Sequence, residues 1–191
     1  MELHRVTNII VHPNFDQDTI DFDIAVVIVN IPFKYNQLVG PACLPFLNPT
    51  NTFEKRQVHL LGWGLLNIGG TQATILQQIK ARVVAIEKCK ELGKSNSDWS
   101  KQLCVLGNNK TTCQSDNGGP VLWRDPVTKR TFLVGIISPN PSCDPEVPSI
   151  NLRVGAYLDW IERQALKDYS YCKLELDLKL QIQSSDLSIQ I

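Results

Sequence analysis

The sequence has no excess of charge of either sign and no long apolar run. Its 191 residues hold 19 Lys and Arg against 19 Asp and Glu, so the formal net charge is zero. Without a charge excess there is no electrostatic basis for general binding to nucleic acid or to an anionic membrane. No apolar run approaches the roughly 20 residues that span a bilayer. We therefore expect neither nucleic acid nor a membrane as a partner, and the 43% hydrophobic content suits a folded soluble protein.

The cysteines lack the spacing of a metal site. None of the six forms a Cys-x-x-Cys pair, and no His/Cys cluster has the spacing of a zinc site. Two interpretations are open from composition: disulfides formed in an oxidising compartment, or scattered buried thiols in a cytosolic protein. No metal or other cofactor is expected. The six are Cys43, Cys89, Cys104, Cys113, Cys143 and Cys172.

A secretion signal is also missing. Met1-Glu2-Leu3-His4 leads directly into strand-like sequence, with no apolar signal region. If the cysteines form disulfides, a chain of secreted type without an export signal indicates that an N-terminal part is absent from this sequence.

Short apolar and β-branched segments, separated by Gly, Pro and Asn, predict an all-β barrel or sandwich. One helix is predicted around residues 157–165, because Tyr157, Trp160, Ile161 and Ala165 share one face. Residues 174–182 alternate between apolar and polar, but no partner strand is obvious, so we expect a disordered or loosely attached tail. The predicted strands are residues 6–11, 24–29, 58–64, 79–86 and 132–137.

Six short motifs stand in a recognisable order along the chain. They are Asp21-Phe22-Asp23-Ile24-Ala25, Gly40-Pro41-Ala42-Cys43-Leu44-Pro45, Gly62-Trp63-Gly64, Ser115-Asp116-Asn117-Gly118-Gly119-Pro120, Val134-Gly135-Ile136-Ile137-Ser138, and the helical segment from Arg153 to Ile161. Together they resemble the chymotrypsin/trypsin-like serine proteases, over residues 4–166. The branch looks like the secreted insect trypsin-like proteins.

The resemblance implies two six-stranded β-barrels with a cleft between them and a closing C-terminal helix. Residues 52–166 match the second barrel and the helix, so that barrel is expected to be complete. Residues 1–51 match only the last strands of the first barrel and the linker, and residues 167–191 are the tail. Because the first barrel cannot close, we expect residues 4–30 to present an exposed apolar face and strand edge.

The resemblance also assigns the catalytic positions. Asp23 matches the aspartate of the Ser-His-Asp triad, and Asn117 stands where the family has its nucleophilic serine. An amide has no proton that a neighbouring imidazole can remove to make a nucleophile at neutral pH. The family's histidine precedes the aspartate by more than the available residues, and His4, His12 and His59 lack its sequence context. We expect these three to be ordinary surface or turn histidines.

Other family positions are altered as well. Ser115 replaces the glycine whose N–H forms the oxyanion hole together with that of the nucleophile, here Asn117. Asp116 matches the carboxylate that pairs with the cleavage-generated N-terminus. No matching terminus exists here, so we expect Asp116 to be hydrated, protonated or turned outward. The specificity pocket maps to Thr111, Ser138, Asn140 and Ser149, which indicate a neutral, narrowed pocket. A glycosylation sequon begins at Asn109.

The resemblance implies two disulfides, Cys89–Cys104 and Cys113–Cys143. A further family bridge is lost, and its positions here are Val58 and Trp123. Cys43 and Cys172 are left unassigned: they are free, paired with each other, or paired with another chain.

Three functions follow as alternatives. The chain is a catalytically inactive protease homologue that binds a protease, a substrate or an inhibitor in an extracellular cascade. Alternatively it is a fragment of a secreted serine endopeptidase, or a product without function. Asn117 and the altered pocket favour the first.

Overall fold

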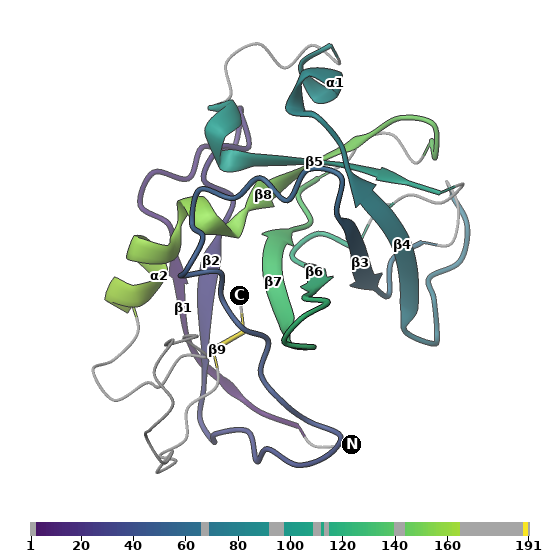
Figure 1. Cartoon of the computed structure of the whole chain (residues 1–191). Coiled ribbons are helices and arrows are strands. Elements are labelled where there is room, and N and C mark those ends of the chain that lie inside the picture. Colours follow the sequence, from purple (N-terminus) through teal and green to yellow (C-terminus); the bar gives the residue numbers. More distant parts are fainter. Residues whose placement is uncertain are drawn as a thin grey trace.

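Six strands between Gln57 and Arg153, in the middle of the chain, close a barrel (Figure 1). The computed structural model describes residues 3–65, 69–91, 98–108, 112, 115–139, 144–164 and 189–190. The barrel order is β3-β4-β5-β8-β7-β6, and β6 pairs back with β3, all antiparallel. The strands are β3 (Gln57–Gly62), β4 (Gln77–Val83), β5 (Gln102–Gly107), β6 (Pro120–Arg124), β7 (Thr131–Ile136) and β8 (Ser149–Arg153). The expected all-β barrel is therefore confirmed.

The barrel interior is filled by the alternate residues of its strands. In β3, Val58 and Leu60 are buried while Gln57 is exposed, as the two-residue period of a strand requires. Val58 lies beside Trp123, since β3 and β6 pair in the register His59↔Leu122. Trp123 packs on Phe53 and Phe132, with ring centroids 5.4 and 5.7 Å apart. Apolar packing thus occupies the two positions where the resemblance placed a lost disulfide.

The N-terminal segment forms a separate three-stranded sheet. β1 (Val6–Val11) pairs antiparallel with β2 (Ala25–Val29), as the sequence predicted. The other edge of β2 pairs with β9 (Ile189–Gln190), which comes from the tail. The alternating segment 174–182, for which no partner strand was expected, lies outside the described residues. Within the described ranges, this sheet does not close into a second barrel.

A short helix joins the sheet to the barrel. α2 (Leu158–Gln164) follows the 3-10 turn η2 (Val154–Ala156) and lies beside β1 and β2 in Figure 1. Trp160 and Ile161 are buried in a cluster that also contains Val26 of β2 and Ile136 of β7. Burial of this shared cluster holds the two sheets together. No helix in the described ranges is long and apolar enough to cross a bilayer.

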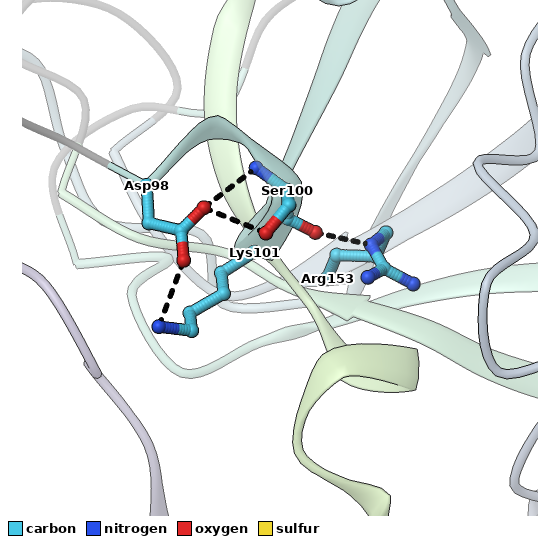
Figure 2. A network of polar contacts seen from close by, with 4 residues as sticks. All are labelled: Asp98, Ser100, Lys101 and Arg153. Carbon is cyan, nitrogen blue, oxygen red and sulfur yellow. Dashed lines mark hydrogen bonds and ion pairs between the residues drawn. The ribbon is translucent and has the colours of Figure 1, made fainter.

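A polar network fixes the turn before β5 (Figure 2). The turn is the 3-10 helix η1 (Trp99–Lys101), and α1 (Ile86–Lys90) lies further upstream. Asp98 accepts bonds from the Ser100 amide and hydroxyl, and pairs with Lys101 at 2.9 Å. Lys101 also lies 4.3 Å from the centre of the Phe22 ring. The buried Arg153 donates to the carbonyl oxygens of Ser100 and Pro49.

Removing the Asp98 carboxylate should make the free energy of unfolding depend less on pH in the acid range. Hydrogen bonds from the Ser100 side chain, followed by Lys101, lower the pKa of Asp98 to about 2. The folded-state pKa lies below the unfolded value, so the stabilisation is present above pH 4 and is lost as pH falls towards 2. The carboxylate is half exposed, so solvent screening limits the effect to about 1 kcal/mol.

We therefore expect Asp98→Ala to lower the free energy of unfolding by about 1 kcal/mol at pH 7 and by much less at pH 2.5. Urea denaturation at the two pH values measures this difference. Asp18→Ala, at an exposed loop position, is the control and should change little at either pH. If Asp98→Ala lowered the free energy of unfolding equally at both pH values, the lowered pKa of Asp98 would be contradicted.

Candidate functional site

Asp23 lies at the end of a tight loop between β1 and β2. In this loop, Ile20 and Phe22 both have the left-handed backbone conformation, with φ 59° and 56°. Phe22 stacks on His12 with ring centroids 4.8 Å apart, which anchors the loop. Asp23 is half-buried, and Ser138 donates a hydrogen bond to its carboxylate. Burial raises the pKa of Asp23, and the Ser138 bond partly opposes that rise.

The loop that carries Asn117 is hydrogen-bonded to Ile137, which follows β7 and precedes Ser138. The Gly118 amide donates to the Ile137 carbonyl at 2.8 Å, and the Ile137 amide donates to the Gly119 carbonyl at 2.8 Å. The Gly119 amide closes the turn onto the Asp116 carbonyl at 2.9 Å. Since Ser138 follows Ile137 and bonds Asp23, the segment after β7 connects the Asn117 loop to Asp23. The Asn117 side chain itself is exposed.

Gly118 and Gly119 are required by this geometry. Gly118 has φ 81°, a conformation that glycine adopts without penalty. A Cβ on Gly119 would lie 2.7 Å from the Leu61 carbonyl oxygen and 2.8 Å from that of Asp116. Both contacts involve backbone, so the loop could not relax by rotating a side chain.

Asp116 faces the Gly62-Trp63-Gly64 turn. Its Oδ1 accepts the Gly64 amide at 2.8 Å, and a Cβ at Gly62 or Gly64 would overlap the carboxylate. The alternative of an outward-turned Asp116 is therefore wrong. The two glycines leave the space that the half-buried carboxylate fills, and the backbone N–H satisfies part of its hydrogen-bonding capacity.

Ser115 has φ 71° although it carries a Cβ. The left-handed conformation costs a non-glycine residue about 1–2 kcal/mol. Neither the Ser115 nor the Asn117 amide has an assigned acceptor among the described residues. Where the resemblance implies glycine, Ser115 therefore has a strained backbone conformation.

We expect Ser115→Gly to raise the free energy of unfolding by about 0.5–1 kcal/mol. Relief of the strained φ is partly offset, because glycine makes the unfolded chain more flexible by about 0.4–1 kcal/mol. Chemical denaturation measures the change. Thr74→Gly is the matched control, since Thr74 is exposed and does not have a positive φ. It should be destabilising, and a loss of similar size for both variants would refute the strain at Ser115.

The three histidines of the chain make their contacts with residues outside the Asn117 loop. His12 begins a turn, as one of the two alternatives expected, but its side chain is buried and not at the surface. Its ring packs on Phe22, Tyr157 and Trp160, residues from distant parts of the chain, and burial lowers its pKa. His4 bonds the Ile31 carbonyl at 2.8 Å and contacts Phe33, while His59 lies in β3 and bonds Gln78.

The described pocket positions are neutral and buried. The Ser149 hydroxyl donates to the Val105 carbonyl at 3.3 Å and accepts from Asn151 Nδ2 at 3.0 Å. Asn151 was not indicated by the motifs, because a buried asparagine inside a strand carries no distinctive pattern. Its Oδ1 and the hydroxyl oxygen of Thr112 are buried without a hydrogen-bond partner in the described part of the chain. Thr111, Asn140 and the Asn109 sequon lie outside the described residues.

One of the two expected disulfides is present. Cys89 of α1 bonds Cys104 of β5, which confirms that pairing. Cys43 is also disulfide-bonded, so the alternative of a free thiol is wrong. Cys113, Cys143 and Cys172 lie outside the described residues. The described residues contain no group of three or more His, Cys, Asp or Glu side chains placed to hold a metal ion.

A closed six-stranded antiparallel barrel, a C-terminal helix and an Asp23–Ser138 pair linked to the Asn117 loop define a trypsin-like serine protease domain. A family model described as Trypsin matches residues 2–161. The chain belongs to the trypsin family, as the sequence motifs predicted.

Its relatives include proteases of several animals. The chain is 31% identical over 172 residues to "Venom serine protease" of Polistes dominula, with 90% of the chain and 61% of that protein covered. It is 36% identical over 177 residues to "Venom serine protease 34" of Apis mellifera, covering 91% and 43%. It is 26% identical over 170 residues to "Clotting factor G beta subunit" of Tachypleus tridentatus, covering 83% and 55%. The chain therefore spans about half of the length of these relatives.

Proposed function

We propose that this chain is a non-cleaving serine protease homologue that binds a protein partner through the surface around the exposed Asn117. The observation that carries the proposal is the side chain at the nucleophile position, an exposed amide on a loop that is otherwise held in place. The amide cannot supply the alkoxide-like oxygen that acyl transfer needs. Asp23 still accepts a hydrogen bond from Ser138. The loops of the site are therefore retained while the nucleophile is absent, and this combination supports a binding role.

The histidines support the same conclusion. A general base must lie within hydrogen-bond reach of the nucleophile. His12 is enclosed by three aromatic rings, and its lowered pKa comes first from burial and then from Lys101 and Arg163. His4 and His59 are held by partners outside the Asn117 loop. Within this sequence, no histidine takes the place of the family's base.

The setting we propose is extracellular, in a cascade of proteases. The Cys89–Cys104 disulfide suits an oxidising compartment. One relative is by name a clotting factor subunit and two are by name venom proteases. The partner would be a protease, a protease substrate or a protease inhibitor. We further propose that the β1-β2-β9 sheet is an incomplete first barrel.

The second candidate is a fragment of a secreted serine endopeptidase. The coverage of only 61% and 43% of two relatives favours it. A transcript that adds a signal peptide, an Ile-Val-Gly-Gly start and an Ala-Ala-His-Cys stretch would establish it. Asn117→Ser in that longer form then shows whether the nucleophile alone was missing. Absence of activity would implicate Ser115 and the pocket.

Binding to the surface around Asn117 can be tested directly on this chain. The probe is a protein inhibitor that inserts a loop into the cleft of trypsin-like proteases, and calorimetry measures its affinity. We expect binding to the chain, and at least a tenfold loss on Asn117→Arg, which places a long charged side chain at the centre of the loop. Val127→Arg, at an exposed turn between β6 and β7, is the control and should bind normally. Absence of binding, or equal loss in both variants, would contradict the proposal.

A further inference from the structure

The balanced net charge of the chain conceals an uneven distribution. Residues 54–59, 77–83 and 120–131 hold seven of the 19 Lys and Arg residues but two of the 19 Asp and Glu residues. These segments supply β3, β4 and β6 with the loop before β3 and the turn after β6, and the three strands are neighbours in the barrel wall (Figure 1). One part of the barrel surface is therefore basic, although the chain as a whole is neutral.

The strand register places three of the cations on the outside of the barrel. Lys80 and Arg82 flank the buried Ala81 of β4, so both side chains point away from the barrel interior and are exposed. The exposed Gln57 of β3 lies opposite Arg82, and the antiparallel register of β3 with β6 carries the exposed Arg124 to the same level. Given the spacing of strands and of alternate residues, the backbones of these three cations lie within about 12 Å of one another.

The loop before β3 extends this basic face. The Lys55 amide donates to the Val83 carbonyl at 2.8 Å, and the Val83 amide donates to the Arg56 carbonyl at 3.0 Å. The Arg56 guanidinium also lies 6.0 Å from the centre of the Trp123 ring. Both loop residues are exposed. These contacts hold two further cations beside Arg82, at the end of β4.

Few carboxylates neutralise the basic face. Glu54 is exposed at its border. Asp125 is near Arg56, but its two oxygens accept the hydrogen bonds that close the turn after β6. With the carboxylates of the described ranges, four of the cations form no salt bridge: Lys55, Lys80, Arg82 and Arg124. Their charge is therefore available to a partner of opposite sign.

The side chains between the cations indicate the kind of partner. Gln57 and Gln78 are polar and exposed on the same face. An interface between folded proteins usually has an apolar core, and a membrane-binding surface adds apolar side chains that enter the bilayer. This face instead combines cations, which form charge-assisted hydrogen bonds with oxyanions, and amides, which bond hydroxyl groups. A sugar polymer that carries sulfate groups supplies both kinds of partner group.

We propose that the basic face binds a sulfated polysaccharide, with Lys80, Arg82 and Arg124 as the central contacts and Lys55 and Arg56 beside them. Such binding would retain the protein at a cell surface or in an extracellular matrix. The choice of a polysaccharide among polyanions rests on the extracellular setting proposed above. The face itself is separate from the Asn117 loop, because Arg124 ends β6 whereas that loop precedes its first residue. Binding there does not depend on whether the chain cleaves peptides.

The probe is heparin, and calorimetry measures its affinity for the full chain at several salt concentrations around about 0.15 M. We expect binding that weakens as salt rises, because each bound cation displaces a counterion of the polymer. Lys80→Gln/Arg82→Gln/Arg124→Gln should weaken binding about tenfold or more at about 0.15 M salt and make it less dependent on salt. The three positions are exposed, so these substitutions leave the core intact.

The matched control removes the same three charges elsewhere, as Arg5→Gln/Lys88→Gln/Arg163→Gln at exposed positions. It should bind heparin like the parent chain. Equal losses in the two variants, absence of heparin binding, or equal binding of desulfated heparin would overturn the proposal. Tighter binding of polyglutamate or of phosphatidylserine vesicles than of heparin would also overturn it, since the occupant would then be an acidic protein segment or a membrane.

Lysine acetylation of the parent chain, followed by peptide mass spectrometry, provides a site-specific measurement that needs no variant. Heparin should protect Lys55 and Lys80 from acetylation and leave Lys88 reactive. Equal protection of all three lysines, or protection of none, would contradict the proposal. The inhibitor titration with Asn117→Arg is a separate experiment, so failure of heparin binding and failure of the proposed function are distinguishable.

Discussion

Replacing Trp160 with alanine is expected to lower the free energy of unfolding by about 3–5 kcal/mol. Trp160 is only 6% exposed and lies in the cluster that joins the N-terminal sheet to the barrel. Its ring centroid is 4.9 Å from that of His12, which belongs to the loop after β1. Removal of the indole leaves a cavity in the cluster that also contains Val26 and Ile136, two residues whose strands belong to different sheets.

Urea denaturation of Trp160→Ala and Trp63→Ala measures this effect with the same substitution at two sites. Trp63 is 54% exposed, so its loss should change stability by less than about 1 kcal/mol. Hydrogen exchange should also show that β1 and β2 lose protection in Trp160→Ala before β3 does. Equal destabilisation by the two substitutions would mean that the shared cluster does not hold the sheets together.

Removing the Cys89–Cys104 disulfide is expected to lower the free energy of unfolding by about 3 kcal/mol. The bridge closes a sequence separation of 15 residues, and the chain-entropy model gives about 3 kcal/mol for a loop of this size. Both cysteines are buried, so Cys89→Ala/Cys104→Ala avoids placing new polar groups in the core.

Chemical denaturation without reductant compares this double variant with Lys90→Ala. Lys90 neighbours the bridge in α1 but is exposed, and its replacement should cost less than about 0.5 kcal/mol. A double variant as stable as the parent chain would show that the loop is already ordered in the unfolded state.

Much of the fold could be predicted from local sequence patterns. β1, β2, β3 and β7 carry runs of β-branched and apolar residues, the apolar residues of β4 alternate with charged ones, and α2 carries an apolar stripe. β8 could not be predicted in this way, because its buried inward positions include Ser149 and Asn151, which remove the apolar alternation. β6 begins at Pro120, a residue that argues against a strand. The pairing of β9 depends on a strand more than 150 positions earlier, so no local pattern indicates it.

The candidate site was predicted to a smaller extent. The motifs located Asp23 and Asn117, whose roles remain proposals, but not the contact of Ser138 with Asp23, which needs the barrel and the N-terminal sheet to be packed together. Burial of His12 depends in the same way on Trp160 and Tyr157 of the C-terminal region. The orientation of Asp116 follows from the space above Gly62 and Gly64, which a sequence without tertiary contacts does not reveal.

Reaction of the purified chain with a fluorophosphonate, followed by intact-mass analysis and peptide mapping, tests the proposed loss of catalysis most directly. The probe forms a stable adduct with the activated serine of a working serine protease. Because residue 117 is asparagine, we predict no adduct within residues 115–120 under conditions that fully label an active trypsin-family protease. A stoichiometric adduct in this segment that disappears on Asn117→Ala would contradict the account.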